Sequence, residues 1–412
     1  MRILYHLGIL SYTFILNTLA LFGHRKAKLW IDGRKDWRSK LQEKFKGVSS
    51  CIWIHCASLG EYELSVPLIN ELKKRNPSQH LFITFFSPSG FEVKKNDALV
   101  FHVDYLPIDS AANARDLISI IKPEMVFFAK YDYWFHYLNE LKVQSIPTYV
   151  FSASFRPSQV FFKPYGAWYR KMLLNFTTLF VIEEESKKLL QSIAIENVII
   201  TGDTRYDRVS DTAHANRTIS FIEDFKTTHH LLIAGSTWPE DEDVLIPFIN
   251  ESIPNFKFII APHEIAESHL QGIEEKLKAP YIRYSQISAD SILSNTTVII
   301  IDNIGMLSAL YKYGDIAYIG GAFKQGLHNI LEPLSFGLPV LFGPHFKRFP
   351  EAISFIHSKG AFSITDTSTL RLKINELRSA QELDHIKKLN STLIKQHVGA
   401  THKIIQSIPW QN

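Results

Sequence analysis

The sequence predicts an α/β protein with two Rossmann-like, doubly wound domains that follow an N-terminal membrane-associated helix. Its 412 residues exceed what one ordinary hydrophobic core organises. Short apolar runs alternate with amphipathic stretches, which is typical of parallel sheets covered by helices on both faces. The N-terminus carries a long apolar stretch.

The N-terminal stretch has the composition of a membrane helix. Residues 3–22 contain no Asp, Glu, Lys or Arg, and about 20 such residues are needed to cross a bilayer core. Polar side chains interrupt the stretch, so a helix lying in the interface is a serious alternative, and a buried core helix is a weaker one. Basic residues follow, which predicts a cytoplasmic orientation and contact with anionic headgroups of a membrane surface, with no nucleic acid as partner. These residues are Arg25, Lys26, Lys28, Arg34, Lys35, Arg38, Lys40, Lys44 and Lys46.

Composition places the rest of the chain among globular proteins. Hydrophobic residues make up 46% and charged residues 21%, which excludes a largely disordered chain. The net charge of +4 favours an anionic ligand only weakly. Cys51 and Cys56 fall in one apolar run and suit reduced core thiols better than a disulfide, so a reducing cytosol is expected rather than an export compartment.

Apolar runs in the first half are expected to form parallel strands. They cover residues 51–57, 80–86, 99–104, 125–129, 147–151 and 178–182. Helix patterns between them cover residues 61–75, 109–121, 133–143 and 161–175. Because crossovers between parallel strands are right-handed, this alternation gives a doubly wound layer.

The alternation stops in the polar residues 205–228 and then resumes. The later strands are expected at residues 230–235, 256–261, 297–302, 315–319 and 338–342. The tail after 366 is helical and is expected to pack back onto the first half. We therefore predict an anchor and basic linker in 1–46, one Rossmann-like domain in 47–210 and a second one with a helical tail in 211–412. Ligands of open parallel sheets bind beyond the carboxyl ends of the strands, so site residues are sought where strands lead into helices.

Glu61 stands at the first such junction. Gly60 ends the apolar run that begins at 51, and a helix is expected from 61. A carboxylate in the first helical turn is favoured by the helix macrodipole alone. It can equally act as a general base when it lies within hydrogen-bond reach of a hydroxyl. Position alone leaves both interpretations open.

The stretch 320–344 has the features of a nucleotide-sugar pocket. Gly320 and Gly321 follow an expected strand and leave the backbone bare for close approach. His328 and Asn329 are expected to open a helix whose free N–H groups bind an anion. Glu332 follows with a carboxylate able to bind sugar hydroxyls. Packing explains the glycines but not this cluster of polar residues.

Other junctions offer polar groups for the same pocket. Ser236 and Thr237 end an expected strand and carry hydroxyls suited to N-capping or phosphate contact. His263 ends the next strand. Arg205 lies beside the polar joint and offers a fixed cation for developing phosphate charge. A lone histidine is more often simply solvated, and a lone arginine is more often a surface ion-pair partner.

No metal and no other cofactor is expected. Asp241, Glu242 and Asp243 look like the acidic triplet with which some glycosyltransferases hold a divalent metal. They follow Pro239 in the first turn of an expected helix, where acids are favoured anyway. The sequence has no His/Cys cluster with zinc spacing and no GxxxxGK[ST] phosphate loop.

Several motifs occur together and in order: WIHCASLGE, FSPSGFE, KYDYW, GDTRYD, GST, GGAF…GLHNILEP and LFGPH. They resemble the Kdo (3-deoxy-manno-octulosonic acid) transferases of lipopolysaccharide assembly, from the N-terminal anchor to about residue 350. SLGE, and HNxLEP followed by GPH, are the most specific. The resemblance implies a two-domain GT-B glycosyltransferase at the cytoplasmic face of the inner membrane. It also implies metal-independent transfer of Kdo from CMP-Kdo to a hydroxyl of a lipid A precursor, with inversion at the anomeric carbon.

The resemblance assigns roles to individual residues. Glu61 becomes the proton acceptor, and Arg205 takes the basic position that stabilises the transition state. The first domain becomes the acceptor-binding domain and the second the CMP-sugar-binding domain. The expected donor-binding residues are Ser236, Thr237, Pro262, His263, Gly305, Met306, Leu307, Gly320, Gly321, His328, Asn329, Ile330, Leu331 and Glu332.

The chain departs from the family pattern at three places. The family commonly has Glu-Thr-Glu-Leu-Trp where this chain has residues 130–134, so the first acid is Lys130 and Asp132 keeps the second. The usual Pro-Arg-His becomes residues 262–264, which weakens an expected arginine–phosphate contact, and Gly-Glu-Leu becomes residues 305–307. Lys130 and Asp132 are retained as candidate catalytic residues, and the same reaction with an altered grip on donor or acceptor is expected.

Two other functions are compatible with the sequence. The nearer one is a different GT-B glycosyltransferase that uses a UDP-sugar and a lipid-linked acceptor. The more distant one is a non-catalytic, membrane-tethered nucleotide-binding protein. The nucleotide that binds distinguishes the first alternative from Kdo transfer, and the presence of turnover distinguishes the second.

Overall fold

The computed structural model describes residues 1–214, 218–288 and 291–410, which form two compact units. The first unit contains Met1–Arg208 together with Val398–Asn412, and the second contains Val209–His397. The division falls two residues before the predicted boundary at 210. The helical tail packs onto the first unit from Val398 on, as predicted, although the predicted domain bounds counted this segment with the second domain.

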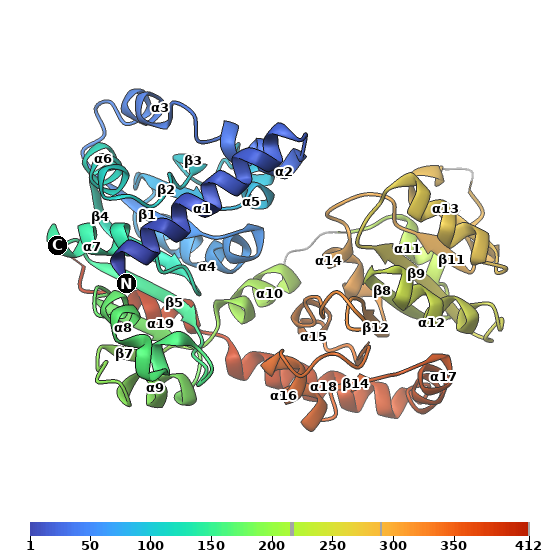
Figure 1. The fold of residues 1–412 in the computed structure, drawn as a ribbon. Coiled ribbons are helices and arrows are strands. Elements are labelled where there is room, and N and C mark those ends of the chain that lie inside the picture. The colour runs from blue at the N-terminus through green and yellow to red at the C-terminus, as the bar shows by residue number, and fades with distance from the viewer. Residues whose placement is uncertain (215–217, 289–290, 411–412) are drawn as a thin grey trace. The chain divides into compact units, whose positions relative to one another are not determined.

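The first unit is built on a seven-stranded parallel sheet with the order β3-β2-β1-β4-β5-β6-β7 (Figure 1). Its strands are β1 (Cys51–Cys56), β2 (Leu81–Phe85), β3 (His102–Tyr105), β4 (Pro123–Ala129), β5 (Thr148–Ala153), β6 (Thr178–Val181) and β7 (Val198–Ile200). Every residue of β1 and β2 is buried, as expected of central strands covered on both faces. The predicted parallel sheet is confirmed. Sequence reasoning missed β7, which has only three residues and is partly exposed.

Helices cover this sheet and connect its strands. They are α1 (Arg2–Leu21), α2 (Arg25–Asp32), α3 (Trp37–Lys44), α4 (Leu59–Arg75), α5 (Pro88–Lys94), α6 (Ala111–Ile121), α7 (Phe135–Val143), α8 (Ala167–Leu173), α9 (Glu184–Gln191), α10 (Thr204–His214), which runs past the end of the unit, and α19 (Ala400–Gln406). The helix predicted over 161–175 is wrong in its first half, where the 3₁₀ turns η1 (Val160–Phe162) and η2 (Pro164–Gly166) stand instead. Pro164 lacks an N–H and disfavours helical geometry in the residue before it.

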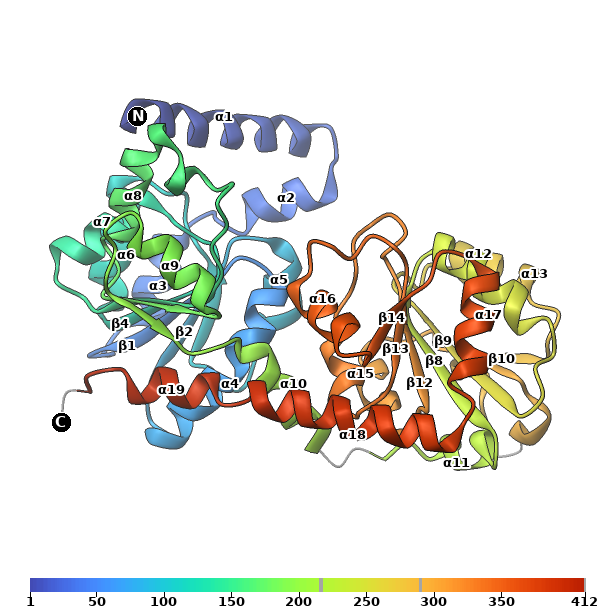
Figure 2. The ribbon, with the colours of Figure 1, turned by 90° about the horizontal axis from the view of Figure 1, so that it is seen from below.

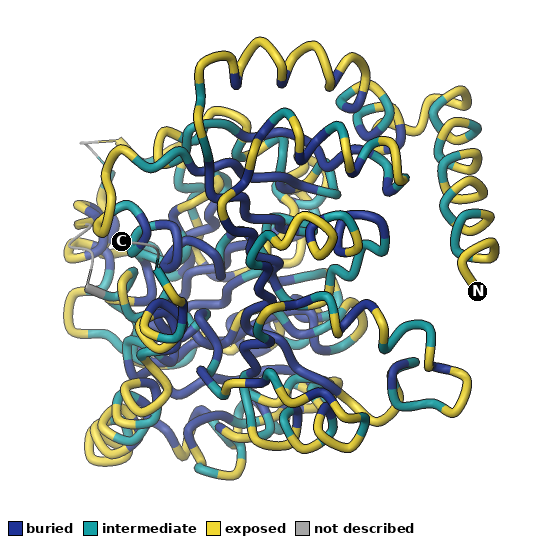
Figure 3. The backbone as a smooth tube through the Cα atoms, turned by 90° about the vertical axis from the view of Figure 1, so that its left-hand side faces the viewer, coloured by how far each residue is buried: buried dark blue, intermediate teal, exposed yellow. Residues whose placement is uncertain are grey.

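Helix α1 has one face on the first unit and one face exposed. The Tyr5 hydroxyl donates to Asp109 at 2.5 Å, and the Tyr12 ring stacks on Phe86 with centroids 5.9 Å apart. The opposite face exposes large apolar side chains such as Leu7, which is 53% exposed, and Phe14, which is 73% exposed. No residue of α1 is buried (Figure 3), so a core helix is excluded. By length and composition the helix could cross a membrane.

The basic linker does not present all of its charges to solvent. Arg34 is buried, and its guanidinium donates to the carbonyl oxygens of Leu106, Trp30 and Phe86 at 2.8–3.0 Å. It lies 3.8 Å from the centroid of the Trp30 ring, and burial lowers its pKa to about 9. The prediction that Arg34 faces lipid headgroups is therefore wrong, because this cation fastens α2 to the sheet. The other basic residues of the cluster are exposed.

The second unit has its own seven-stranded parallel sheet, ordered β10-β11-β9-β8-β12-β13-β14. The strands are β8 (His230–Thr237), β9 (Phe256–Pro262), β10 (Tyr281–Arg283), β11 (Val298–Ile300), β12 (Ile316–Ile319), β13 (Val340–Phe342) and β14 (Ala361–Ser363). The three-residue edge strands β10 and β14 were not predicted, since short strands carry little periodic signal. The helices and turns are α11 (Phe221–Lys226), α12 (Pro239–Ile249), α13 (Glu267–Lys276), η3 (Tyr284–Gln286), η4 (Leu293–Asn295), α14 (Leu307–Leu310), η5 (Tyr311–Tyr313), α15 (Leu331–Ser335), α16 (Pro350–His357), α17 (Thr367–Glu376) and α18 (Ala380–His397).

The C-terminal helix α19 packs beside α4 in the first unit (Figure 2). The Asp207 carboxylate accepts hydrogen bonds from the backbone N–H groups of Gly399 and Thr401 at 2.6 and 2.7 Å. Ile404 and Ile405 belong to the same apolar cluster as the buried face of α4. The burial of this face explains why the chain returns to the first unit.

Candidate active site

The first unit places its candidate catalytic residues at one edge of the sheet. Glu61 follows β1, and Lys130 and Asp132 follow β4. These two strands are neighbours, with β2 and β3 on one side and β5 to β7 on the other. The strand order therefore reverses between β1 and β4, which is where open parallel sheets bind ligands.

Glu61 is held in the first turn of α4. Ser58 is the N-cap residue, accepts from the Gly60 N–H and donates its hydroxyl to Glu61 Oε2. The Glu61 carbonyl accepts from the Ser65 hydroxyl at 2.6 Å. Glu61 is half-buried, so its carboxylate is fixed in direction and still reachable by a ligand.

The neighbouring carboxylate, Glu63, is in a different position. Its Oε2 lies 2.9 Å from the Arg208 guanidinium, and its Oε1 lies 3.3 Å from the Lys94 ammonium. Glu61 makes no ion pair within the described part of the chain. A carboxylate without a cation partner keeps its oxygens available for a hydrogen bond from a ligand hydroxyl. Of the two acids in this stretch, Glu61 is thus the one suited to act as a base.

Arg205 lies in the first turn of α10, which packs on α4. The Thr204 hydroxyl donates to the Leu64 carbonyl at 2.6 Å. The Arg205 Nε and Nη2 atoms both lie 2.8 Å from Asp203 Oδ2. Burial opposes ionisation of Asp203, but the charges of Arg205 and Lys130 lower its pKa overall. The structure thus brings Arg205 and Lys130, which are far apart in sequence, around one buried carboxylate.

Asp132 has a partner that the sequence did not indicate. Its Oδ2 lies 2.8 Å from Nε2 of the fully buried His55. His55 Nδ1 in turn lies 2.8 Å from the Thr84 hydroxyl, and the Trp134 indole N–H donates to His55 Nε2 at 3.2 Å. Asp132 is therefore anchored to the centre of the sheet. The sequence did not indicate a role for His55, because a histidine inside an apolar strand gives no periodic signal of its own.

In the second unit the expected donor-binding residues gather at one sheet edge. They follow β8, β9, β11 and β12, which are consecutive in the order β11-β9-β8-β12. The strand order reverses between β8 and β12, so Ser236 and Thr237 lie beside Gly320 and Gly321 at the reversal point. Ser236 O is 2.2 Å from where a Cβ on Gly320 would stand, so only glycine fits there.

An aromatic stack forms at this edge. The rings of Trp238 and His263 have centroids 4.8 Å apart, and those of His263 and His328 are 4.4 Å apart. The Trp238 indole N–H donates to His328 Nε2 at 2.9 Å. Burial, together with the nearby His263, lowers the pKa of His328 to about 4. His328 is therefore neutral at pH 7 with its ring proton on Nδ1. Trp238 was missed from sequence, although it directly follows Ser236 and Thr237.

Asp241 fixes the glycine turn. Its carboxylate accepts from the Gly321 N–H at 2.8 Å, from the Tyr318 hydroxyl at 2.7 Å and from the Trp238 N–H at 3.0 Å. The neighbouring Glu242 and Asp243 bind elsewhere, to His269 and Lys276. The three acids therefore point to different partners. Asp241 and Glu242 stand in the first turn of α12, as predicted, whereas Asp243 follows that turn.

The residues after Gly321 differ from the prediction. His328 and Asn329 do not open a helix, because α15 begins at Leu331 and has only five residues. Asn329 Oδ1 accepts from the Leu331 N–H at 3.1 Å, and Asn329 Nδ2 donates to Glu332 at 3.0 Å. The expected anion site at a helix N-terminus is thus replaced by a turn that Asn329 holds with its side chain.

The other predicted residues differ in accessibility. Thr237 does not cap α12, since Trp238 is the N-cap residue and the Thr237 hydroxyl donates to Glu242 at 2.9 Å. Gly305 is exposed with a φ of +91°, and Met306 next to it is buried as the N-cap residue of α14. Pro262, Ile330 and Leu331 are buried. These three buried residues can contact a ligand only through their backbone or their apolar side chains.

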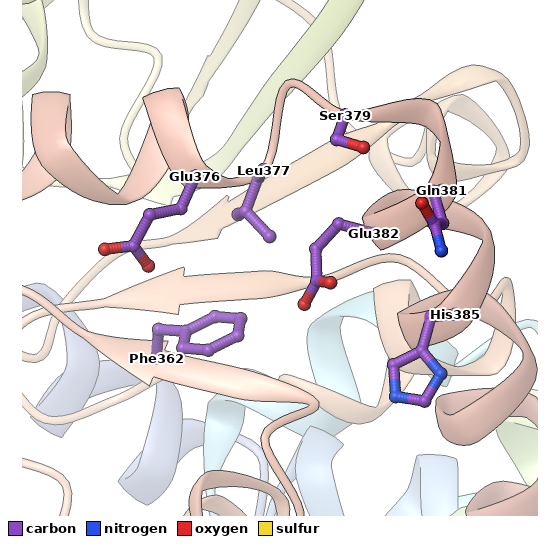
Figure 4. Close-up of a pocket in the computed structure, with 7 residues that line it drawn as sticks. All are labelled: Phe362, Glu376, Leu377, Ser379, Gln381, Glu382 and His385. Carbon is purple, nitrogen blue, oxygen red and sulfur yellow. The ribbon is translucent and has the colours of Figure 1, made fainter.

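A separate hollow of about 630 Å³ lies between β14 and the turn from α17 to α18 (Figure 4). Its walls are formed by Phe362, Glu376, Leu377, Ser379, Gln381, Glu382 and His385. None of these residues was predicted to bind the donor. This hollow is therefore distinct from the edge that gathers the motif residues.

Known proteins with similar sequences agree with the arrangement of both units. A family model described as 3-deoxy-D-manno-octulosonic-acid transferase (kdotransferase) matches residues 35–208. The 3-deoxy-D-manno-octulosonic acid transferase of Haemophilus influenzae is 27% identical over 90% of this chain and 90% of its own length. That of Chlamydophila psittaci is 26% identical over 79% of this chain and 76% of its own length.

Residues 35–208 thus match the Kdo transferase domain, and most of the chain is similar to known Kdo transferases. These similarities indicate that the protein is a glycosyltransferase. The match of the family model includes Glu61, Lys130, Asp132 and Arg205.

Solved structures show the fold of the chain. UDP-GlcNAc 2-epimerase from Neisseria meningitidis matches with a TM-score of 0.59 and 17% identity, over 86% of this chain and 98% of that one. MurG from Acinetobacter baumannii matches with a TM-score of 0.53 and 11% identity, over 87% of this chain and 99% of that one. The predicted GT-B architecture is confirmed.

Proposed function

We propose that the protein is an inverting glycosyltransferase that moves Kdo from CMP-Kdo to a hydroxyl of a lipid A precursor, with Glu61 as general base. One observation carries the proposal: at the sheet edge of a Kdo transferase-family domain, Ser58 orients a half-buried glutamate that has no cation partner among the described residues. The neighbouring Glu63 is ion-paired, which supports the assignment of the base to Glu61.

The reaction is a single displacement. Glu61 takes the proton of the acceptor hydroxyl while its oxygen forms a bond to the anomeric carbon of Kdo. The bond from that carbon to the phosphate oxygen breaks, and its electron pair leaves with CMP. Attack from the face opposite the leaving group inverts the anomeric configuration. Arg205 and Lys130 supply positive charge that stabilises the negative charge developing in the transition state.

The donor is proposed to bind at the second unit's strand-reversal edge. Gly320 and Gly321 let the backbone approach the ligand closely, and Asp241 holds their turn in place. The stack of Trp238, His263 and His328 offers a surface on which a pyrimidine base can stack. Because His328 is neutral, it would contribute a hydrogen-bond donor and not a charge.

The proposed location is the cytoplasmic face of the inner membrane, with α1 lying in the interface. Tyr5 and Tyr12 attach the first half of α1 to the folded unit, so this half cannot enter the bilayer core by itself. Its other face is apolar and exposed, and exposed basic residues follow in α2. This combination is typical of an interfacial helix.

The function is tested by incubating the purified full-length protein with CMP-Kdo and a lipid A precursor and weighing the lipid product. A mass increase by whole Kdo units is expected. A thermal-shift assay identifies the nucleotide that the protein binds: CMP should raise the melting temperature more than UDP does. Stabilisation by UDP with transfer from a UDP-sugar would favour the other glycosyltransferase function, and binding without turnover would favour the non-catalytic one.

Membrane attachment gives a further prediction. The double variant Leu7→Glu and Phe14→Glu should move from vesicles of anionic phospholipid to the supernatant in a flotation assay. Each large apolar side chain contributes about 1.5–3 kcal/mol when fully buried, so losing two should weaken binding by roughly tenfold or more. Leu372→Glu is the matched control, because Leu372 is 64% exposed on α17 in the second unit. Equal flotation of the double variant and the wild type would contradict the role of α1.

A further inference from the structure

An apolar cavity of about 300 Å³ lies in the first unit beneath α1. Its walls are formed by Ile9, Tyr12, Thr13, Trp30, Phe86, Ile108, Asp109 and Trp134. The last four directly follow β2, β3 or β4. They therefore lie at the carboxyl edge of the sheet, the same edge at which Glu61 follows β1.

The polar groups of the wall are mostly used within the protein. The Thr13 hydroxyl donates to the Ile9 carbonyl at 2.9 Å. Asp109 accepts from the Tyr5 hydroxyl and from the backbone N–H groups of His136 and Tyr137. What the cavity offers a ligand is aromatic and aliphatic surface, which selects a hydrocarbon chain over a sugar or a phosphate.

One buried donor in the wall lacks a partner. Trp30 is only 4% exposed, and its indole Nε1 makes no hydrogen bond in the part of the chain that the structure describes. Buried indole N–H groups usually find an acceptor. An ester or amide carbonyl at the head of an acyl chain would supply one.

The cavity lies next to the helix that is proposed to contact the membrane. Helix α1 forms one wall with Ile9, Tyr12 and Thr13 and exposes Leu7, Leu10 and Phe14 on its other face. The same helix would therefore contact both the bilayer interface and an acyl chain in the cavity. We propose that this cavity holds one acyl chain of the lipid acceptor, an inference that rests on the proposed function.

One wall residue of the cavity is linked through hydrogen bonds to a candidate catalytic residue. Trp134 lines it and donates to His55, which binds Asp132. A chain seated against Trp134 therefore anchors the acceptor at the sheet edge that carries Glu61. Binding of the acyl chain would hold the acceptor hydroxyl near Glu61. Acylated acceptors should therefore react faster than deacylated acceptors with the same sugar headgroup.

The test fills the cavity and compares two acceptors. Thr13→Phe places a ring in the cavity and should reduce the preference in kcat/KM for the acylated over the deacylated acceptor by about tenfold or more. Thr18→Phe is the matched control: Thr18 lies on the same helix, its hydroxyl also donates to a carbonyl four residues back, and it does not line the cavity. It should keep the wild-type preference. A wild type without a preference, or equal ratios in both variants, would overturn the proposal.

Binding is measured separately from turnover by photocrosslinking. An acceptor with a diazirine on its acyl chain should label peptides containing Ile9 or Trp30 in the wild type and much less in Thr13→Phe. Excess unlabelled acceptor should compete, and phospholipid should not. Equal labelling by a diazirine phospholipid would assign the cavity to bulk lipid and refute the proposal. If no Kdo is transferred at all, the proposed function fails, and labelling alone decides whether the cavity binds the chain.

Discussion

Glu61→Gln is expected to lower kcat by about a hundred- to ten-thousand-fold, because a positioned general base contributes that much. The glutamine side chain still offers an oxygen to the Ser58 hydroxyl that now donates to Glu61, so the first turn of α4 should remain intact. Only the ability to take a proton is removed. Affinity for CMP-Kdo, measured by calorimetry, should stay near the wild-type value, because the donor is proposed to bind in the second unit.

Glu63→Gln is the matched control for this experiment. It makes the same chemical change two residues further along α4, at a carboxylate paired with Arg208 and Lys94. Partly exposed ion pairs contribute roughly 0–1 kcal/mol, so turnover should change by only a few-fold. Near-normal turnover in Glu61→Gln, or an equal loss in both variants, would remove Glu61 from the role of base.

Arg205→Lys should lower kcat by roughly a hundredfold, the size of effect seen when one donor to a developing negative charge is lost. Lysine keeps the positive charge next to the buried Asp203 but cannot reproduce the paired contacts of Nε and Nη2 with Oδ2. The fold should therefore survive while the geometry of the cation changes. The KM for CMP-Kdo should change little, since the interaction is proposed to strengthen only in the transition state.

Arg208→Lys controls for the general effect of replacing an arginine in α10. Arg208 lies one turn after Arg205 and pairs with Glu63. Its substitution should leave kcat within a few-fold of the wild type. Should Arg205→Lys retain full kcat, or raise KM alone, Arg205 would be a binding or structural residue and not a stabiliser of the transition state.

The sequence was sufficient for the sheets and for the position of Glu61. Strands such as β1, β4, β8 and β9 are continuous apolar runs, and local periodicity reports burial on both faces. Gly60 ends the apolar run that begins at 51, so the glutamate after it could be placed at a strand-to-helix junction from the sequence, although α4 begins at Leu59. Short edge strands such as β7 and β14 were not visible, because three residues carry no period.

Only the tertiary structure decided which side chains pair with which. It buried Arg34 against backbone carbonyls, joined His55 to Asp132 across neighbouring strands, and gave Glu63 two cations while leaving Glu61 none in the described part of the chain. It also set Val398 as the residue from which the tail joins the first unit. The reason is physical: a hydrophobic period is a local property of the chain, whereas an ion pair or a buried hydrogen bond joins residues whose separation in sequence carries no signal.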